Sequence, residues 1–188
     1  MISEADFAEH YRNNYRRVLG LCRHLLGRLQ SAEDATQEVF LRAHRSLASY
    51  DPTRPFEGWI LTIASNYCID VVRRRRKEAQ LFGTEGEERI AAEADDSDVL
   101  GDLLAQERAA ELKAAMASLP ERYRLPLVLA YYRDASYDEV AAALGITRTH
   151  AGALICRAKQ ALRRTLTAAN DESRESNVES RTLNKETA

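Results

Sequence analysis

GWILTIASNYCIDVVRRRRK, residues 58–77, contains the only tryptophan of the chain and ends in five consecutive cations. At helical spacing its apolar side chains share one face, namely Ile60, Ile63, Tyr67 and Val71, and polar ones share the other, namely Thr62, Asn66, Asp70, Arg73 and Lys77. The pattern predicts an amphipathic helix over about 55–77, with Pro55 in the first turn, where proline is tolerated. Two interpretations of the cationic end stay open here: a solvated end that suits the helix dipole, and a surface for a polyanion.

Length and composition indicate a folded, helix-rich chain. The 188 residues suffice for one large domain or two small ones, and the contents of 45% apolar and 30% charged residues are unlike those of a disordered chain. No apolar run approaches the ~18 residues of a membrane span, and the polar start MISEADFAEHYRNN does not resemble a signal peptide. The sequence therefore predicts a cytoplasmic protein.

Three cysteines, Cys22, Cys68 and Cys156, lie far apart in the sequence, and none belongs to a CxxC pair. The histidines form no ligand cluster near them. We interpret all three as reduced thiols, and we expect no disulfide, no metal site and no cofactor.

Charge is distributed unevenly along the chain. Residues 1–77 have a charge balance of +4 and residues 113–167 one of +5, whereas residues 78–112 between them have -9 and residues 168–188 have -2. A partner that binds both basic blocks at once would be a polyanion.

Helix-start signals recur along the chain. Capping-box spacing is found in three pairs: Ser3 with Asp6, Ser31 with Asp34, and Ser136 with Glu139. These predict helices near 4–28, 32–48 and 137–144, and further helical patterns cover about 98–117 and 120–132, with an irregularity at Pro126. No segment alternates with period two, so no sheet is expected.

The predicted fold class is all-α, with two small helical domains at residues 1–77 and 113–167. Residues 78–112 between them hold a flexible acidic linker, centred on LFGTEGEERIAAEADDSD, and the start of the next helices. The tail at 168–188 has almost no apolar content, and we expect it to be disordered.

The segment SYDEVAAALGITRTHAGALICRAKQALRRTL, residues 136–166, has the layout of a helix-turn-helix. Gly145 supplies the backbone freedom needed where the first helix ends. The second helix is expected from about Thr149 to Leu166. Side chains placed to face a major groove are Arg148, Thr149, His150, Arg157 and Lys159. An ordinary helical hairpin is the alternative.

Taken together, these blocks resemble a sigma factor of the sigma-70 family, in the extracytoplasmic-function (ECF) group. SAEDATQEVFLRAHRSL is similar to region 2.2 of the family, and RPFEGWILTIASNYCIDVVRRRRK to regions 2.3 and 2.4. LPERYRLPLVLAYYRDASYDEVAAALGI is similar to region 4.1 and the start of region 4.2. The resemblance extends to about residue 167. It implies a non-enzymatic subunit that binds core RNA polymerase, directs it to promoters and helps to melt them.

The resemblance also implies site residues. The loop Tyr50–Gly58 and the helix after it would hold the -10 element, because a melting domain must stabilise a base taken out of the duplex. The implied -10 residues are Tyr50, Phe56, Trp59, Asn66, Arg73, Arg74, Arg76 and Lys77. For Trp59 the alternative to DNA contact is a structural role in the core.

Core polymerase binding is implied for Asp34, Gln37, Glu38 and Leu41, which follow one another at three- or four-residue steps. They would contact the coiled-coil clamp of the β′ subunit; a solvated polar stripe is the alternative. Further implied partners are the β subunit, promoter DNA and an anti-sigma factor. The acidic segment would pass through the cleft or RNA exit path of polymerase, or would serve only as a solubilising linker.

One departure concerns the second helix of the helix-turn-helix. Gly152 and Leu154 stand where the family usually has basic residues, so the resemblance leaves open which residues read the -35 element. Two other classes of function fit the sequence less well. A self-sufficient DNA-binding regulator would leave residues 31–77 without a purpose, and an enzyme would need a phosphate loop, nucleophile elbow or HExxH motif, none of which occurs.

Overall fold

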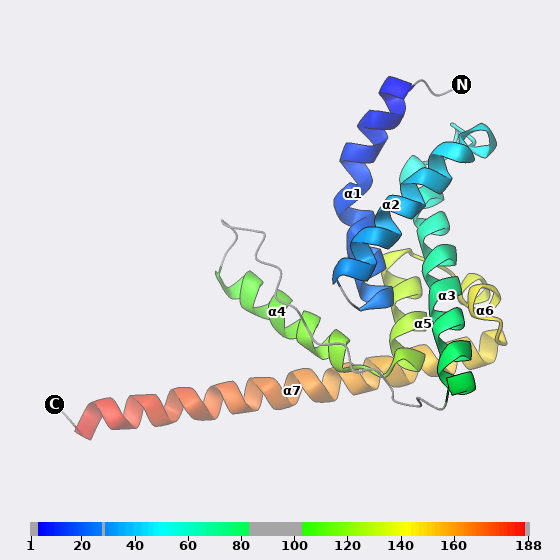
Figure 1. The fold of residues 1–188 in the computed structure, drawn as a ribbon. Helices are drawn as coiled ribbons and strands as arrows, with labels where there is room; N and C mark the ends of the chain where they lie inside the picture. The colour runs from blue at the N-terminus through cyan, green and yellow to red at the C-terminus, as the bar shows by residue number, and fades with distance from the viewer. Residues whose placement is uncertain (1–3, 28, 83–102, 187–188) are drawn as a thin grey trace.

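The computed structural model describes the backbone of residues 4–27, 29–82 and 103–186, and the side chains of 6–27, 30–81 and 110–168. Within these residues the protein consists of helices and contains no strand, which confirms the all-α prediction (Figure 1). The elements are α1 (Glu4–Leu26), α2 (Leu29–Arg45), η1 (Leu47–Ser49), α3 (Phe56–Phe82), α4 (Leu103–Ser118), α5 (Glu121–Tyr132), α6 (Tyr137–Leu144) and α7 (Arg148–Glu186).

Helices α1, α2 and α3 form the first bundle. Its core is aliphatic and aromatic, and its largest fully buried side chains are Val18, Leu21, Leu25, Val39 and Ile60. Burial of such side chains is the dominant favourable term in folding, at roughly 1.5–3 kcal/mol for each.

The buried face of α3 differs from the predicted one. Ile60 is fully buried as expected, but Ile63, Tyr67 and Val71 are only half-buried. A second apolar row, which includes Leu61 and Ile69, is buried as well. The predicted stripe allowed for one packing partner, whereas α3 packs against α1 and α2 and also contacts α6 (Figure 1).

Helices α4 to α7 form the second bundle, with a core that includes Leu129, Val140, Ile155 and Ala158. Gly145 has φ 68° and ψ 35°, the left-handed conformation that glycine adopts without steric cost. The N–H of Ile146 donates to the carbonyl of Ala141, which closes α6 and turns the chain into α7. The predicted helix-turn-helix is thus present as α6 and α7.

The capping box at Ser136 is confirmed. The Ser136 Oγ accepts from the Glu139 N–H, while the Ser136 N–H and Oγ–H both donate to the Glu139 carboxylate at 2.8 Å. These hydrogen bonds from Ser136 hold the pKa of Glu139 below its usual range. Because the folded-state pKa is depressed, the carboxylate stabilises the fold above its ordinary pKa, and that contribution is lost as the pH falls.

Replacing Ser136 with alanine is therefore expected to lower the free energy of unfolding by about 1 kcal/mol at neutral pH. Below about pH 4 the difference from the parent chain should shrink, since Glu139 is then protonated in both. Urea unfolding at the two pH values measures this. Thr165→Ala, an exposed change in α7, is the control. If Ser136→Ala lowers the free energy of unfolding no more than Thr165→Ala does, the cap contributes little.

Other predicted boundaries differ from the structure. The box of Ser31 with Asp34 does not start α2, which begins at Leu29; instead Ser31 Oγ accepts a hydrogen bond from Arg75 at 3.1 Å. Ser3 and most of the acidic linker lie outside the described residues. α5 continues through Pro126.

The tail also differs from the expectation of disorder, because α7 continues to Glu186. Residues 168–186 contain neither proline nor glycine. A helix already formed and packed further up can extend through such a segment, since propagation costs far less than nucleation.

All three cysteines are free, and two of them are neighbours in space. Cys22 of α1 and Cys68 of α3 are buried in the first bundle and share a hydrogen bond. That hydrogen bond and burial raise the pKa of Cys68, which therefore stays protonated. None of the described helices is long and apolar enough to span a membrane.

The two bundles pack against each other. Leu125 and Val128 of α5 belong to the first core, and Ile69 of α3 belongs to the second. α5 contacts α1, and α6 contacts α3 (Figure 1). The two predicted domains are therefore docked side by side in this structure.

Candidate nucleic-acid and polymerase interface

The first candidate surface is the outer side of α2. Asp34, Gln37 and Leu41 are exposed there, and Glu38 is half-buried because its carboxylate accepts a hydrogen bond from Arg42 at 2.7 Å. Leu41 has 53% of its surface exposed and lies one turn beyond Gln37 and Glu38. The surface therefore combines an apolar side chain with polar ones, as protein interfaces do.

The second candidate surface is the loop before α3, which is closed by its own hydrogen bonds. The Asp51 carboxylate accepts from the N–H and hydroxyl of Thr53, at 3.0 and 2.8 Å. These bonds lower the pKa of Asp51. The Tyr50 hydroxyl donates to the carbonyl of Arg54 at 2.6 Å. The loop therefore has a defined shape before any ligand binds.

An aromatic cluster lies beneath this loop. Tyr50, Phe56 and Trp59 have mutual ring-centroid distances of 5.0 to 5.3 Å. Phe56 is only 5% exposed, so it supports the loop from within, whereas Tyr50 and Trp59 are half-buried. Trp59 therefore combines its two interpretations, since it packs against the core and still reaches the surface.

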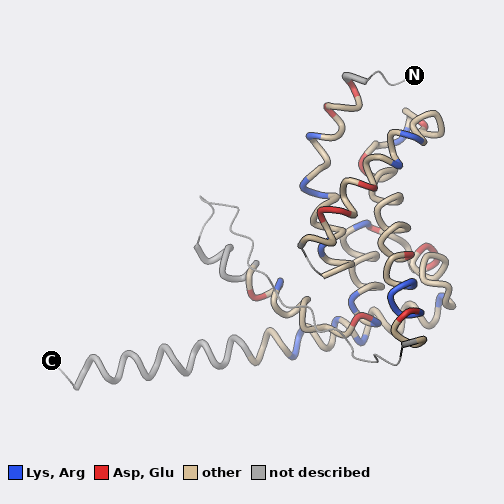
Figure 2. The backbone as a smooth tube through the Cα atoms, viewed as in Figure 1, with Lys and Arg blue, Asp and Glu red and all other residues tan. Residues whose placement is uncertain are grey.

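The cationic end of α3 lies beside the second bundle. Arg73 donates to the carbonyl of Ala143 at 2.8 Å, and Arg76 donates to the Glu121 carboxylate at 2.6 Å. Figure 2 shows a run of Lys and Arg, in blue, at this end of α3. Arg74, Lys77 and Asn66 are exposed.

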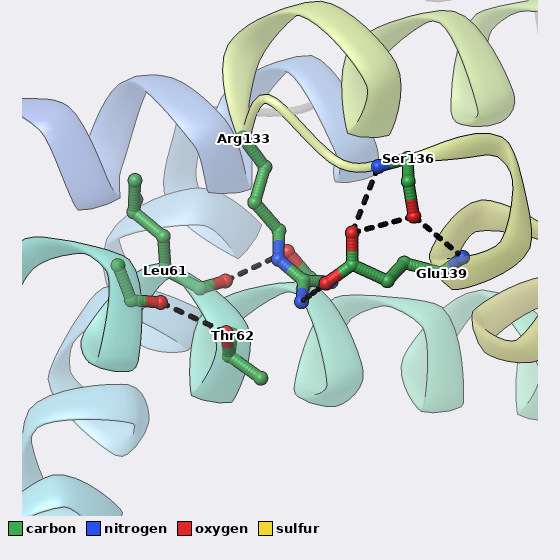
Figure 3. A network of polar contacts seen from close by, with 7 residues as sticks. Leu61, Thr62, Arg133, Ser136 and Glu139 are labelled. Atoms are coloured by element: carbon green, nitrogen blue, oxygen red, sulfur yellow. Dashed lines mark hydrogen bonds and ion pairs between the residues drawn. The ribbon is translucent and has the colours of Figure 1, made fainter. Parts of the chain in front are cut away.

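Arg133 fills the space between the bundles. Its guanidinium is 4.0 Å from the Glu139 carboxylate, and only 13% of its side chain is exposed. Figure 3 shows the side chain extending from the end of α5 toward Leu61 and Thr62 of α3, with Glu139 and Ser136 on its other side. The capped start of α6 is thus connected to α3 through one cation.

Tyr132 makes a further contact between the bundles. Its hydroxyl donates to the carbonyl of Arg17 in α1 at 2.9 Å. Burial raises the pKa of Tyr132, which keeps the hydroxyl protonated as a donor. A Cβ added to Gly20 would lie 2.3 Å from that oxygen. Only a glycine at position 20 leaves room for Tyr132 in this position.

The third candidate surface is the outward stripe of α7. The helix begins at Arg148, and the Thr147 hydroxyl caps it by accepting from the His150 N–H at 3.2 Å. Ala151, Ile155 and Ala158 are buried. At 3.6 residues per turn, the side most distant from them is formed by exposed residues, namely Thr149, Ala153, Arg157, Gln160 and Arg164.

Only some of the predicted groove-facing residues lie on the outward stripe. Thr149 and Arg157 lie on the outward stripe, and His150 is exposed at one edge. Arg148 and Lys159 are at the other edge: Arg148 is 3.6 Å from Asp138, and the Lys159 ammonium lies 4.7 Å from the centre of the Tyr131 ring.

Gly152, where the chain departs from the family pattern, packs under α6. A Cβ at this position would be 3.6 Å from the Tyr137 ring, which is ordinary van der Waals contact. A long basic side chain here would have to pass that ring.

Comparison with known proteins matches both bundles. Residues 10–78 match the family profile of Sigma-70 region 2, and residues 109–162 match that of Sigma-70, region 4. The ECF RNA polymerase sigma factor SigE of Mycolicibacterium smegmatis is 36% identical over 155 residues, which are 82% of this chain and 59% of SigE. The ECF RNA polymerase sigma factor SigW of Bacillus subtilis is 30% identical over 86% of this chain and 88% of SigW.

The chain belongs to the ECF sigma factors of the sigma-70 family. The expected class of function, a transcription initiation factor and not an enzyme, is confirmed by this membership. The chain spans less than two thirds of the length of SigE and most of the length of SigW.

Two solved structures share the fold of this sigma factor. The sigma factor RpoE, solved with the anti-sigma factor NepR from Bartonella quintana, aligns over 86% of this chain and 97% of that chain, with a TM-score of 0.62 and 22% identity. CnrH, solved with the cytosolic domain of CnrY, aligns over 88% of this chain and 90% of that chain, with a TM-score of 0.53 and 21% identity.

Sequence reasoning missed several residues of this sigma factor that the structure places at the candidate surfaces. Gln160 and Arg164 lie on the outward stripe of α7 and could have been found by extending the helical step beyond Arg157. Phe7 and His10 of α1 lie against the aromatic cluster beneath the loop. No local signal connects them to that loop, because they lie far from it in the sequence.

Proposed function

We propose that this ECF sigma factor binds core RNA polymerase through the outer side of α2 and directs it to promoters with two recognised elements. The loop before α3 and the exposed face of α3 bind the -10 element and hold a base taken out of the duplex. The outward stripe of α7 binds the -35 element in a major groove. The observation that carries this proposal is the aromatic loop followed by a cationic helix, in one chain with a capped helix-turn-helix.

The chemistry of the -10 surface supports its part in the proposal. Unpairing a base costs a few kcal/mol, and stacking on aromatic rings together with pocket contacts offsets that cost. Tyr50 and Trp59 supply half-buried rings, and Asn66, Arg74 and Lys77 supply exposed polar groups and positive charge along α3. Of the other cations at this end, Arg73 and Arg76 are paired with the second bundle, and Arg75 donates to Ser31 of α2.

Function at a promoter requires the two bundles to separate. The -10 and -35 elements are centred about 25 base pairs apart, which is on the order of 85 Å of duplex at ~3.4 Å per base pair. In the docked arrangement Arg73 is 2.8 Å from Ala143, at the end of the first helix of the helix-turn-helix. Binding to core polymerase would place the bundles apart and release Arg73 and Arg76 for the DNA backbone.

Further partners and the location of the protein belong to the same proposal. The β′ clamp coiled coil is the partner of α2, the β subunit is a second contact, and an anti-sigma factor holds the chain inactive. Family membership supports an anti-sigma partner, and so does the solved complex of the sigma factor RpoE with the anti-sigma factor NepR, which has the same fold. A protein with these partners works in the cytoplasm.

Run-off transcription tests the proposal. Purified core polymerase is supplied with genomic fragments, with and without this chain. Transcripts that start only when the chain is present are expected, and their upstream sequences give both promoter elements. No new transcripts, together with tight duplex binding by the chain alone, would instead indicate a self-sufficient regulator.

The stripe on α7 predicts different contributions from two cations. Arg157→Ala is expected to reduce transcription from a promoter recovered in this way about fivefold, because Arg157 faces outward and an arginine contact with DNA is worth on the order of 1 kcal/mol or more. Lys159→Ala removes the same charge from a side chain directed at Tyr131, and should cost less. Equal losses in the two variants would contradict the assigned stripe.

A further inference from the structure

The loop that is proposed to hold the -10 base is supported by α1, far from it in sequence. The His10 ring is stacked on the Phe56 ring, with centroids 4.1 Å apart and an interplanar angle of 8°. Phe7, one turn earlier, approaches the same ring edge-on at 6.2 Å. Phe56 is therefore fixed from below by α1 while it contacts Tyr50 and Trp59 above.

We propose that His10 is a positioning residue of the -10 loop, and that its ring sets promoter discrimination at the -10 element through Phe56. This inference rests on the proposed -10 function of the loop. In this inference His10 does not itself contact DNA. It acts through two ring contacts in sequence, from His10 to Phe56 and from Phe56 to Tyr50 and Trp59.

The backbone around His10 is itself held in place. The buried side-chain amide of Asn14 donates to the carbonyl of His10 at 2.8 Å. The α1 support is thus rigid, and the loop above it is closed by the hydrogen bonds of Asp51 and Tyr50. A site that discriminates between bases must hold its groups within about 0.5 Å, and rigid elements do this better than loops. Removing the His10 ring leaves the Phe56 ring free to tilt into the vacated space, and Tyr50 and Trp59 move with it.

The test compares promoter discrimination among three variants. The probe is a promoter recovered by run-off transcription, together with versions that carry each of the other bases at the -10 positions and, separately, at the -35 positions. For each variant the ratio of transcription from the parent promoter to that from the altered one is measured. Such a ratio is independent of the amount of active protein, so partial misfolding does not affect it.

His10→Ala is expected to lower the -10 ratio about fivefold and to leave the -35 ratio unchanged. His10→Phe keeps a flat ring on Phe56 and should retain the parent ratio. Tyr11→Ala is the matched control, because the Tyr11 ring is on the same helix but contacts Phe40 and Tyr15 instead of the loop. It should leave both ratios unchanged.

Three results would overturn the inference: an unchanged -10 ratio in His10→Ala, an equal fall in Tyr11→Ala, or a parallel fall of the -35 ratio. Reactions with the parent chain distinguish failure of this inference from failure of the proposed function. If the parent chain gives no promoter-dependent transcripts, the -10 assignment fails and the inference fails with it. If the parent chain discriminates and His10→Ala discriminates equally, only the inference fails.

Discussion

Leu41→Asp is expected to lower the affinity of this sigma factor for core RNA polymerase about a hundredfold. Leu41 is 53% exposed, one turn beyond the polar residues Gln37 and Glu38 on α2. Burial of a leucine side chain contributes roughly 1.5–3 kcal/mol, and the new carboxylate would be desolvated without a partner. At about 1.4 kcal/mol for each factor of ten, the two losses together give this magnitude.

Fluorescence anisotropy of the labelled chain titrated with core polymerase measures the effect. The matched control is Leu81→Asp, the same exchange at a leucine that is 72% exposed on α3, away from the α2 surface. Both changes are on the surface and should leave the unfolding midpoint nearly unchanged. Triple replacement of Asp34, Gln37 and Glu38 by alanine should also abolish binding. If these variants bind core polymerase with unchanged affinity, α2 is not the polymerase-binding surface.

Gly20→Ala is expected to shift the free chain from the docked to the separated arrangement by about tenfold. The added Cβ would lie 2.3 Å from the Tyr132 Oη and 3.3 Å from its Cζ. Tyr132 must therefore leave its position and lose the hydrogen bond to the Arg17 carbonyl. That hydrogen bond is worth roughly 1 kcal/mol, and the disturbed packing adds to the loss.

Helix propensity alone predicts that Gly20→Ala stabilises the chain, whereas the clash with Tyr132 weakens docking of the two bundles. Alanine is better than glycine in a helix by about 1 kcal/mol, so α1 itself should gain stability. The two contributions are distinguished by two measurements. The unfolding temperature of Gly20→Ala should rise because of helix propensity, while the docked fraction should fall because of the clash. Gly58→Ala is the control, because a Cβ there meets no atom within 4 Å.

Energy transfer between one dye on the exposed Cys156 of α7 and another on Lys77→Cys measures docking. Transfer should fall in Gly20→Ala and stay unchanged in Gly58→Ala. Adding Tyr132→Phe removes the clashing oxygen and should restore part of the transfer. Equal transfer in all of these chains would show that the Tyr132 contact does not hold the bundles together.

The sequence by itself was sufficient for features that depend on neighbours along the chain. The helix-turn-helix was predictable because a capping serine, a glutamate three residues later and a left-handed glycine act within one or two turns. The all-α class followed in the same way from helical periodicity. Family motifs then indicated the -10, -35 and polymerase surfaces, because motifs are short and ordered along the chain.

Only the tertiary structure decided the features that depend on contacts between distant segments. It placed His10 against Phe56, Cys22 against Cys68, and Arg73 and Arg76 against the second bundle. It also showed why α3 is apolar on two sides, since a helix with two packing partners buries two rows. Periodicity reports how apolar a helix face is but not what covers it. The physical reason is that the hydrophobic effect is non-directional. Which element covers an apolar face is therefore decided by shape complementarity in the folded chain.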